Sequence, residues 1–519
     1  MSLMQQGHEM SFTHSFLVAV LFSILLFVFL RHKKRKQPNL PPSPFKLPIV
    51  GNLHQLGSLP HRSLHALSKR HGPLMLLKLG PVPALVVSSA DMAREIMSTH
   101  DLIFSSRPAI SMAKQLMYGK DLAFAPYGEY WKQARKVCIL HLLSTKRVKS
   151  FRSVREEEVA LMIKKIQSSA MMGPVNLSEM IILLNNDITS RIAFGKKYIL
   201  GAEGEDGGHR FRRLFREFLE LLGAFHVGDY FPRLAWISKF NGMDERVEKN
   251  FKEWDDILGG IVKDHEDAKG DDDADADADA DEGMIDFVDV LLQIRKDCTT
   301  GITLTQDHIK ALVMDMFAAG TDTTYAILEW AMAELLTHPK VMKKVQEEVR
   351  ERARGHSMIA EDDLVHMKYL KSVVKEALRL HPPLPLLVPR ESMKDVKIQG
   401  YDIPAKTRVI VNAWTIGRDS KSWEQPEEFQ PERFLSSSSH IDFTGHDFEL
   451  IPFGAGRRGC PGIQFAIAKV ELVLANLLYH FDWEMPNGAT VEDLDMSESP
   501  GITVHKKSVL LLVAKPQSY

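Results

Sequence analysis

The sequence predicts a mainly α-helical protein with small β-sheets, preceded by one N-terminal transmembrane helix. The run FLVAVLFSILLFVFL at residues 16–30 is apolar except for Ser23. With the residues from 11 onward, it approaches the roughly 20 residues that a helix needs to cross a bilayer. Beyond Gly51, stretches with apolar residues at three- and four-residue steps predominate, and short segments of strand character are the minority.

The N-terminal segment is predicted to be an uncleaved anchor at residues 11–30. The basic cluster RHKKRK at 31–36 follows the apolar run, and no Lys or Arg precedes it, so the positive-inside rule places the rest of the chain in the cytosol. A cleaved signal peptide is the alternative, but it needs basic residues before the run and small residues at a cleavage site after it. Residues 31–52 then form a basic stop and a proline-rich hinge, which we expect to be stiff and extended.

Residues 53–519 are predicted to form the folded body. Composition and charge are those of a globular protein, with 45% hydrophobic residues, 25% charged residues and a net charge of −2. This near-neutral balance argues against a nucleic-acid partner. Three cysteines are too few for a disulfide framework and fit a reducing compartment. Helices are predicted at 91–99, 154–167, 245–265, 286–295 and 307–338, and strands at 74–79, 84–87, 396–403, 408–412 and 509–514.

One low-complexity segment interrupts the folded body. Residues 271–282 read DDDADADADADE, which repels itself and has nothing to bury, so we expect an acidic disordered loop. A calcium loop is the alternative, because the carboxylates alternate. Such a loop needs a glycine at its sharp turn, and this run has none.

The string FGAGRRGCPG at 453–462 is the first motif that carries chemistry. The three glycines before the cysteine, Gly454, Gly456 and Gly459, permit close approaches of the backbone, which would suit a flat partner. Pro461 is predicted to open a helix, so the sulfur of Cys460 lies beside a helix N-terminus that favours a thiolate. A thiolate is a known axial ligand of haem iron, and Arg458 could pair with a haem propionate. The alternative is an unreactive buried cysteine beside a glycine-rich turn.

The second motif interrupts the predicted helix at 307–338. The sequence AGTDTT at 319–324 places a glycine and hydroxyl side chains on its apolar stripe. A glycine there costs about 1 kcal/mol against alanine, and hydroxyls compete for backbone carbonyls, so a notch can open. In an enzyme that activates oxygen, the Thr323 hydroxyl and the Asp322 carboxylate could deliver protons. The alternative is helix packing eased by the small residue Gly320.

These strings together resemble the cytochrome P450 family, nearest its plant microsomal A-type enzymes. The match rests on PPSPFKLPIVGN, AGTDTT, KEALRLHPPLPLLVPR and FGAGRRGCPG. The resemblance implies the cytochrome P450 fold for residues 53–519, haem b as cofactor and Cys460 as the iron ligand. It also implies that Thr323 and Asp322 serve catalysis. The residues implied to bind the cofactor are Cys460, Arg458, Trp131, Arg135, Arg390, Phe453 and Gly454.

The resemblance also implies residues outside the chemistry. Glu376, Arg379 and Arg433 match a buried triad that fixes the core around the cysteine loop. Lys132 and Lys136, four apart in the sequence, match a basic surface on which the family docks its reductase, although an ordinary solvated helix face explains them equally well. Substrate contacts are implied at 104–124, around Met316 and Ala319, at 384–388 and at 500–503.

The implied reaction is monooxygenation of a small lipophilic substrate by O₂, with NADPH acting indirectly through NADPH-cytochrome P450 reductase. Terpenoids, alkaloids, coumarins and other phenolics are the expected substrates. The protein would be a single-pass protein of the endoplasmic reticulum membrane, with its catalytic domain facing the cytosol. Two alternatives stay open: a haem-thiolate isomerase or dehydratase that needs no external electrons, and a non-catalytic membrane protein that binds haem or lipophilic ligands.

Overall fold

The computed structural model describes residues 38–197, 204–271, 285–297, 303–435 and 441–517. It divides into two units, which are residues 38–41 with Val396–Ile403, and residues 42–395 with the chain from 404 onward. The predicted anchor and basic stop lie outside the described residues. So does the acidic run, apart from Asp271, which is the last residue of a helix.

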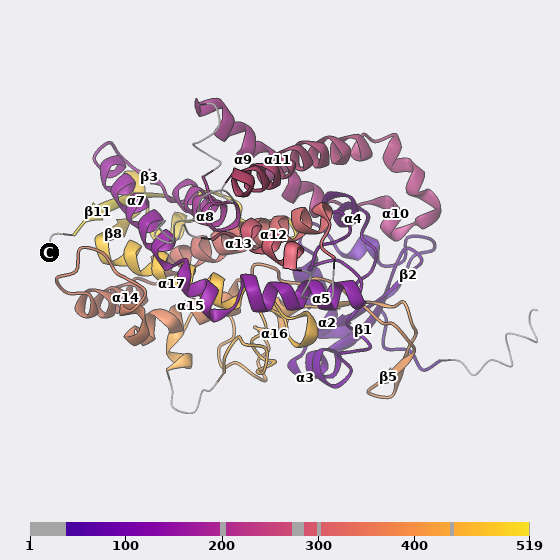
Figure 1. Ribbon diagram of the computed structural model, residues 1–519. Coiled ribbons are helices and arrows are strands. Elements are labelled where there is room, and N and C mark those ends of the chain that lie inside the picture. Colours follow the sequence, from indigo (N-terminus) through magenta and orange to yellow (C-terminus); the bar gives the residue numbers. More distant parts are fainter. Residues whose placement is uncertain (1–37, 198–203, 272–284, 298–302, 436–440, 518–519) are drawn as a thin grey trace, which may run out of the picture. The chain divides into compact units, whose positions relative to one another are not determined.

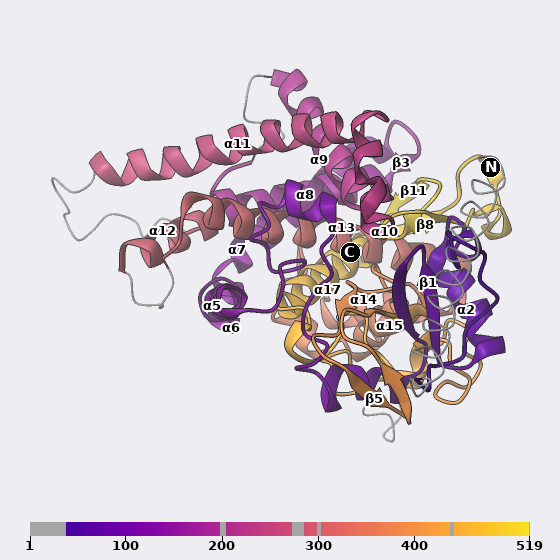
Figure 2. The same cartoon turned by 90° about the vertical axis from the view of Figure 1, so that its right-hand side faces the viewer.

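The larger unit is mainly helical (Figures 1 and 2), as predicted. Its longer helices are α2 (Pro60–His71), α7 (Arg152–Ala170), α8 (Leu177–Phe194), α9 (Gly204–Leu222), α11 (Met243–Asp271), α12 (Phe287–Asp297), α13 (Gln306–Thr337), α14 (Pro339–Arg352), α15 (Lys368–Leu380) and α17 (Ile463–His480). The shorter ones are α3 (Ala90–Arg94), α4 (Ser111–Leu116), α5 (Glu129–Val137), α6 (Thr145–Ser150), α10 (Val227–Tyr230) and α16 (Ala413–Ile416). Helix α13 is buried along most of its length and contacts α8, α15 and α17.

The sheets of this unit are small. In the largest, the strand order is β1 (Leu74–Leu79), β2 (Val82–Val87), β7 (Arg408–Val411) and β4 (Arg390–Glu391), and only the β2–β7 pair is parallel. A second sheet has the order β3 (Val175–Asn176), β11 (Leu511–Pro516) and β8 (Phe481–Glu484), and a third pairs β9 (Glu498–Ser499) with β10 (His505–Lys506). Strand β4 thereby fixes Arg390 beside a buried strand.

The predicted single strand at 396–403 is wrong, because this segment is a hairpin. Strands β5 (Val396–Ile398) and β6 (Tyr401–Ile403) pair antiparallel. Gln399 and Gly400 join them with φ of +49° and +82°, which is the backbone of a tight two-residue hairpin turn. In the same unit, the Asn39 backbone N–H donates to the Asp402 carboxylate and the Asn39 side chain donates to the Gly400 carbonyl. The described end of the proline-rich hinge is therefore hydrogen-bonded to this hairpin.

Two further predictions need correction. The helix predicted at 91–99 is α-helical only as far as Arg94 and continues as a π-helical turn over Glu95–Thr99, in which the His100 N–H donates to the Glu95 carbonyl. The helix after Cys460 begins at Ile463, so Pro461 lies in the turn before it. Among the described residues, α17 alone is long and apolar enough to cross a membrane, and most of it is buried as a core helix.

Candidate functional site

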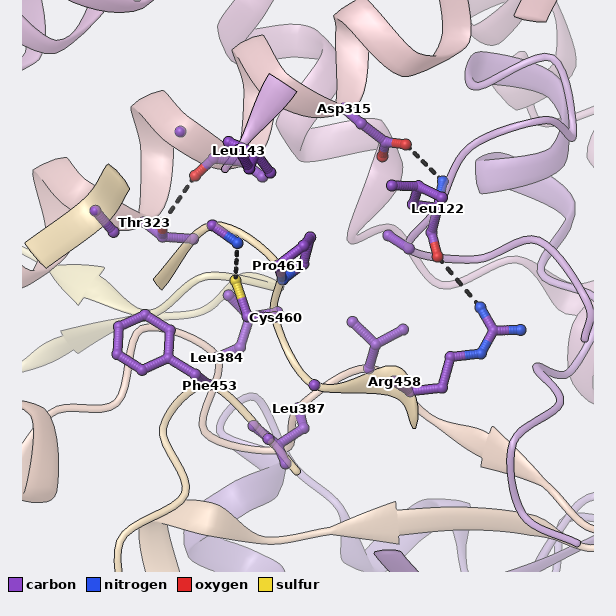
Figure 3. A pocket seen from close by; sticks show the side chains of 18 of the residues that line it. Leu122, Leu143, Asp315, Thr323, Leu384, Leu387, Phe453, Arg458, Cys460 and Pro461 are labelled. Atoms are coloured by element: carbon purple, nitrogen blue, oxygen red, sulfur yellow. Dashed lines mark hydrogen bonds between the residues drawn. The ribbon is translucent and has the colours of Figure 1, made fainter. Parts of the chain in front are cut away.

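A cavity of about 250 Å³ lies between the middle of α13, the segment 383–390 and the loop that leads into α17 (Figure 3). Most of its wall is apolar. Side chains from distant parts of the chain form this apolar wall, among them Leu122, Leu143, Met316, Leu384, Leu387 and Phe453. A cavity of this kind, with a few polar groups that converge on it, is typical of a small-molecule site.

Cys460 lies on the cavity wall. The Gly462 N–H donates to the sulfur over 3.4 Å, and the Cys460 N–H donates to the Phe453 carbonyl over 2.9 Å. The surrounding protein still raises the pKa of the Cys460 thiol, because burial outweighs the Gly462 N–H and the Arg135 charge. The Gly462 N–H, just before α17, lowers this pKa, in the direction predicted for the helix start, but burial has the larger effect. A bound metal would be needed to remove the proton.

Two glycines of this loop have different structural roles. A Cβ on Gly456 would lie 2.2 Å from the Met97 carbonyl oxygen and 2.7 Å from the Asp101 carboxylate, so this glycine lets the loop pack against the π-helical turn. Gly454 lines the cavity with φ of +67°, a conformation that side chains disfavour. Gly454 thus faces the cavity, whereas the close approach at Gly456 is made to another part of the protein.

Four guanidinium groups meet at the cavity. Arg135 of α5, Arg390 of β4 and Arg458 were predicted, and Arg107 was missed. Arg135 donates to the Gly459 carbonyl over 2.7 Å, and Arg390 donates to the Ala455 carbonyl over 2.6 Å. Arg107 and Arg458 are bonded mainly to backbone carbonyls in the same way.

Few carboxylates of the protein pair with these four arginines. Asp101 pairs with Arg390 at 3.1 Å. Burial, with the charges of Arg390 and Arg135, lowers the pKa of Arg458 to about 9. Burial and the charge of Arg458 likewise depress the pKa of Arg107. A ligand with carboxylates would relieve this repulsion, so the wall fits the propionates of haem.

Trp131 does not line the cavity, in contrast to the other predicted cofactor-binding residues. Its ring lies under the Arg458 guanidinium, 3.9 Å from ring centre to Cζ, and its indole N–H donates to the Leu122 carbonyl over 3.0 Å. The structure therefore gives Trp131 an indirect position, in which it supports Arg458 by a cation–π contact.

The two predicted catalytic residues of α13 are placed differently. Thr323 lines the cavity, and its hydroxyl donates to the Ala319 carbonyl over 2.8 Å. Asp322 lies outside the lining, with a carboxylate oxygen 3.1 Å from Nε2 of His505. Successive residues on a helix point about 100° apart, and at this position the step turns Asp322 away from the cavity and toward β10.

Comparison with known proteins decides the family. The sequence profile described as Cytochrome P450 matches residues 41–513. The chain belongs to the cytochrome P450 family. It is 55% identical to "Cytochrome P450 71A1" of Persea americana, with 90% of this chain and 91% of that protein covered. It is 52% identical to "Cytochrome P450 736A117" of Prunus mume (97% and 96% covered) and 49% identical to "Strychnine-11-hydroxylase" of Strychnos nux-vomica (96% and 97% covered). Haem iron is implied by membership of this family.

The predicted ion triad of this cytochrome P450 is assembled in the core. Arg379 donates to both oxygens of Glu376, over 2.6 and 2.7 Å, and Arg433 donates to the same carboxylate over 3.0 Å. The side chains of Glu376 and Arg379 are fully buried. Carbonyls of Gly417, Pro426 and Glu428 accept the remaining Arg379 bonds, so the triad ties α15 to the segment that precedes the cysteine loop.

Two functional candidates in α13 and its surroundings were missed. Asp315 lines the cavity, and its carboxylate accepts the Leu122 N–H over 2.5 Å, which holds the cavity wall to α13 (Figure 3). Burial, with the nearby Asp121 charge, raises the pKa of Asp315 well above its usual value. Of the implied substrate contacts, three of the four stretches reach the cavity, whereas 500–503 does not.

Lys469 of α17 is the second missed residue. It is fully buried, and its amine donates to the Gly320 carbonyl over 2.6 Å, where the Thr324 hydroxyl also donates. In the part of the chain that the structure describes, no carboxylate pairs with it. Burial, with a smaller contribution from Arg155, lowers the pKa of Lys469 to about 7. The residues around Lys469 in the sequence are mainly aliphatic, and nothing in this pattern indicated that the lysine is buried.

Lys469→Met is expected to change how stability depends on pH. Between pH 7 and 10.5 the unfolded chain binds a proton at Lys469 that the folded chain does not, so wild-type stability rises with pH. This contribution is about 1.4 kcal/mol per pH unit, and the variant should lack it. Chemical denaturation across this pH range measures the slope. Equal slopes in the two proteins would show that Lys469 is not buried in its neutral form.

Proposed function

We propose that this cytochrome P450 is a haem-thiolate monooxygenase that inserts one oxygen atom from O₂ into a lipophilic plant specialised metabolite. The observation that carries the proposal is that Cys460 and Thr323 line one apolar cavity from different elements. Cys460 would supply the axial sulfur ligand, and the arginine cluster would pair with the propionates. Haem, when bound, supplies the iron centre at which dioxygen is reduced.

The residues of this chain then act around that centre. The apolar wall excludes water and positions the substrate. The Thr323 hydroxyl lines the cavity from α13 and can pass a proton toward it, because a hydroxyl both accepts and donates. Asp322 is the acid that would return a proton to the Thr323 hydroxyl. Phe453 and Gly454 complete the wall beside the sulfur.

The substrate class follows from the wall and from named relatives. Apolar side chains dominate the lining, which favours a small lipophilic molecule. Relatives with 49% and 50% identity are named "Strychnine-11-hydroxylase" and "Norfluorocurarine oxidase", and these names favour alkaloids within the wider group of terpenoids, coumarins and phenolics.

Electrons would come from NADPH through a cytochrome P450 reductase at the endoplasmic reticulum membrane. Lys132 and Lys136 are exposed on α5 and would belong to the docking surface, although Lys132 also pairs with Glu129 at 3.1 Å. The predicted anchor at 11–30 would hold the catalytic domain on the cytosolic side.

Thr323→Ala tests the proposal against its alternatives. The protein is expressed in microsomes with the reductase and screened with plant alkaloids, terpenoids, coumarins and phenolics. Wild-type product should require both NADPH and reductase, and in the variant the product formed per NADPH oxidised should fall by about 10²-fold. Thr324→Ala is the matched control, since Thr324 makes the same hydroxyl-to-carbonyl bond but does not line the cavity. Product without NADPH, or unchanged coupling in Thr323→Ala, would contradict the proposal.

A further inference from the structure

Asp322 has one polar side-chain partner among the described residues, and that partner is His505 of β10. The two side chains are 6% and 21% exposed, respectively. The carboxyl is thus shielded both from bulk water and from the cavity, whereas the imidazole keeps an edge toward solvent.

The position of His505 is fixed by contacts with α13. The Trp330 indole N–H donates to the carbonyl of Val504, the preceding residue, over 3.1 Å. The Tyr325 ring stacks on the imidazole with 5.1 Å between ring centres and 28° between planes. The backbone of this strand is thus tied to α13 and the imidazole is stacked on one face, with its Nε2 3.1 Å from the Asp322 carboxylate.

The second imidazole nitrogen completes the arrangement. Nδ1 of His505 is buried and has no hydrogen-bond partner among the described residues. A neutral imidazole donates through one nitrogen and accepts through the other, so a proton can enter at Nδ1 while another leaves from Nε2. A water molecule bound at this unpartnered nitrogen would be the donor.

We propose that His505 is a positioning residue of the monooxygenase reaction, which holds Asp322 and passes solvent protons to it. The inference rests on the proposed function. In each turnover the substrate, O₂, NADPH and a proton give the hydroxylated product, water and NADP⁺, and the oxygen atom that leaves as water takes up two protons. A solvent proton, delivered as hydronium, adds at Nδ1 of His505 and gives the imidazolium, which passes its Nε2 proton to the Asp322 carboxylate. The Nδ1–H imidazole that is left returns to the Nε2–H form by exchange of protons with water. Asp322 then rotates toward its neighbour Thr323 and releases the proton there.

Charged groups around His505 determine how readily it holds a proton. Burial works to lower the pKa of His505, but the Asp322 carboxylate outweighs it and, with Glu329, raises the pKa above 6.5. The imidazolium is therefore stabilised beside its acceptor. Asp322 and Glu329 of α13 are the charged groups that act on His505, and Tyr325 of α13 stacks on its ring. In the adjacent strand β9, Ser499 lies opposite His505, whereas Glu498 lies opposite Lys506 and pairs with His61.

His505→Gln tests the inference, because glutamine keeps a donor for Asp322 but cannot carry a proton. Haem content, the carbon monoxide difference spectrum and substrate-binding spectra should stay as in wild type. With reductase, NADPH and a substrate from the screen, product per NADPH should fall about tenfold, and hydrogen peroxide should be released instead. Turnover driven by cumene hydroperoxide, which needs neither NADPH nor these protons, should be unchanged. Wild-type coupling should decline as pH rises through the raised pKa of His505, and coupling in the variant should be independent of pH.

A second readout does not depend on activity. Because the folded pKa of His505 is raised, its pairing stabilises the wild-type protein below pH 6.5, and this contribution is lost as pH rises through the folded pKa. The thermal midpoint of wild type should therefore exceed that of His505→Gln at low pH only. His381→Gln is the matched control. His381 also pairs with a carboxylate of α13, Glu334, over 2.6 Å, but Glu334 is not a neighbour of Thr323 in that helix. Its coupling should equal that of wild type.

The outcomes separate the two claims. Coupling in His505→Gln equal to that of wild type, or an equal loss of peroxide-driven turnover, would overturn the role of His505 and leave the monooxygenase intact. A wild-type protein that binds haem but forms no NADPH-dependent product from any compound would overturn the proposed function, and the role of His505 with it.

Discussion

Cys460→Ser is expected to abolish the thiolate carbon monoxide difference spectrum and to reduce NADPH-dependent product below detection. In the proposed site, Cys460 is the protein's ligand to the iron, and an alcohol does not donate electron density as a thiolate does. The polypeptide should still fold, since the sulfur makes only a weak contact with the Gly462 N–H. The difference spectrum and product formation in microsomes measure the effect.

Cys138→Ala provides the control for this experiment. Cys138 is fully buried in the hydrophobic core, and burial raises the pKa of its thiol far above the usual value, so it is unreactive. Its replacement should leave the spectrum intact. A thiolate spectrum that survives in Cys460→Ser would show that another residue binds the iron.

Glu376→Ala is expected to lower the free energy of unfolding by about 3–5 kcal/mol. The substitution leaves the Arg379 guanidinium buried without a counter-charge, because Arg379 directs two of its bonds at this carboxylate. It also frees the Gln430 N–H, which donates to Glu376 over 2.8 Å. Chemical denaturation of the purified protein gives the free energy, and haem content reports whether the cysteine loop stays in place.

Arg152→Ala is the matched control for the triad. Arg152 pairs with Glu156 at 2.7 Å and with Asp362 at 2.6 Å, but its side chain is 34% exposed. Exposed ion pairs contribute at most about 1 kcal/mol, so this variant should be nearly as stable as wild type. Similar losses in both variants would mean that burial does not distinguish the triad from a surface network.

The sequence was most informative where a function rests on a contiguous string. Cys460, Arg458 and Gly454 lie within one loop, so their spacing alone places them at one cavity wall. The hairpin at 396–403 was missed for a local reason, because the positive φ of Gln399 and Gly400 reverses the chain within a segment of strand composition. Gly400, a residue type common in such turns, was the one feature of this segment that could have predicted the hairpin.

Other parts of the site depend on tertiary contacts that no local pattern records. Arg107 stands alone in an irregular segment, and its partners include the Val388 carbonyl, far away in the sequence. Lys469 has a residue type that usually lies at the surface, and only the packing of α17 on α13 reveals its burial. The pairing of Asp322 with His505 joins positions that are far apart in the chain.

The four guanidinium groups at the cavity have a consequence for the lifetime of the protein in the cell. A folded chain that lacks an anionic ligand keeps these charges close together in a poorly solvated wall. Ligand binding to the folded state alone shifts the folding equilibrium by mass action. Newly made chains should therefore be degraded faster when haem is scarce, so that the abundance of this protein follows the haem supply of its tissue even when its transcript level is constant.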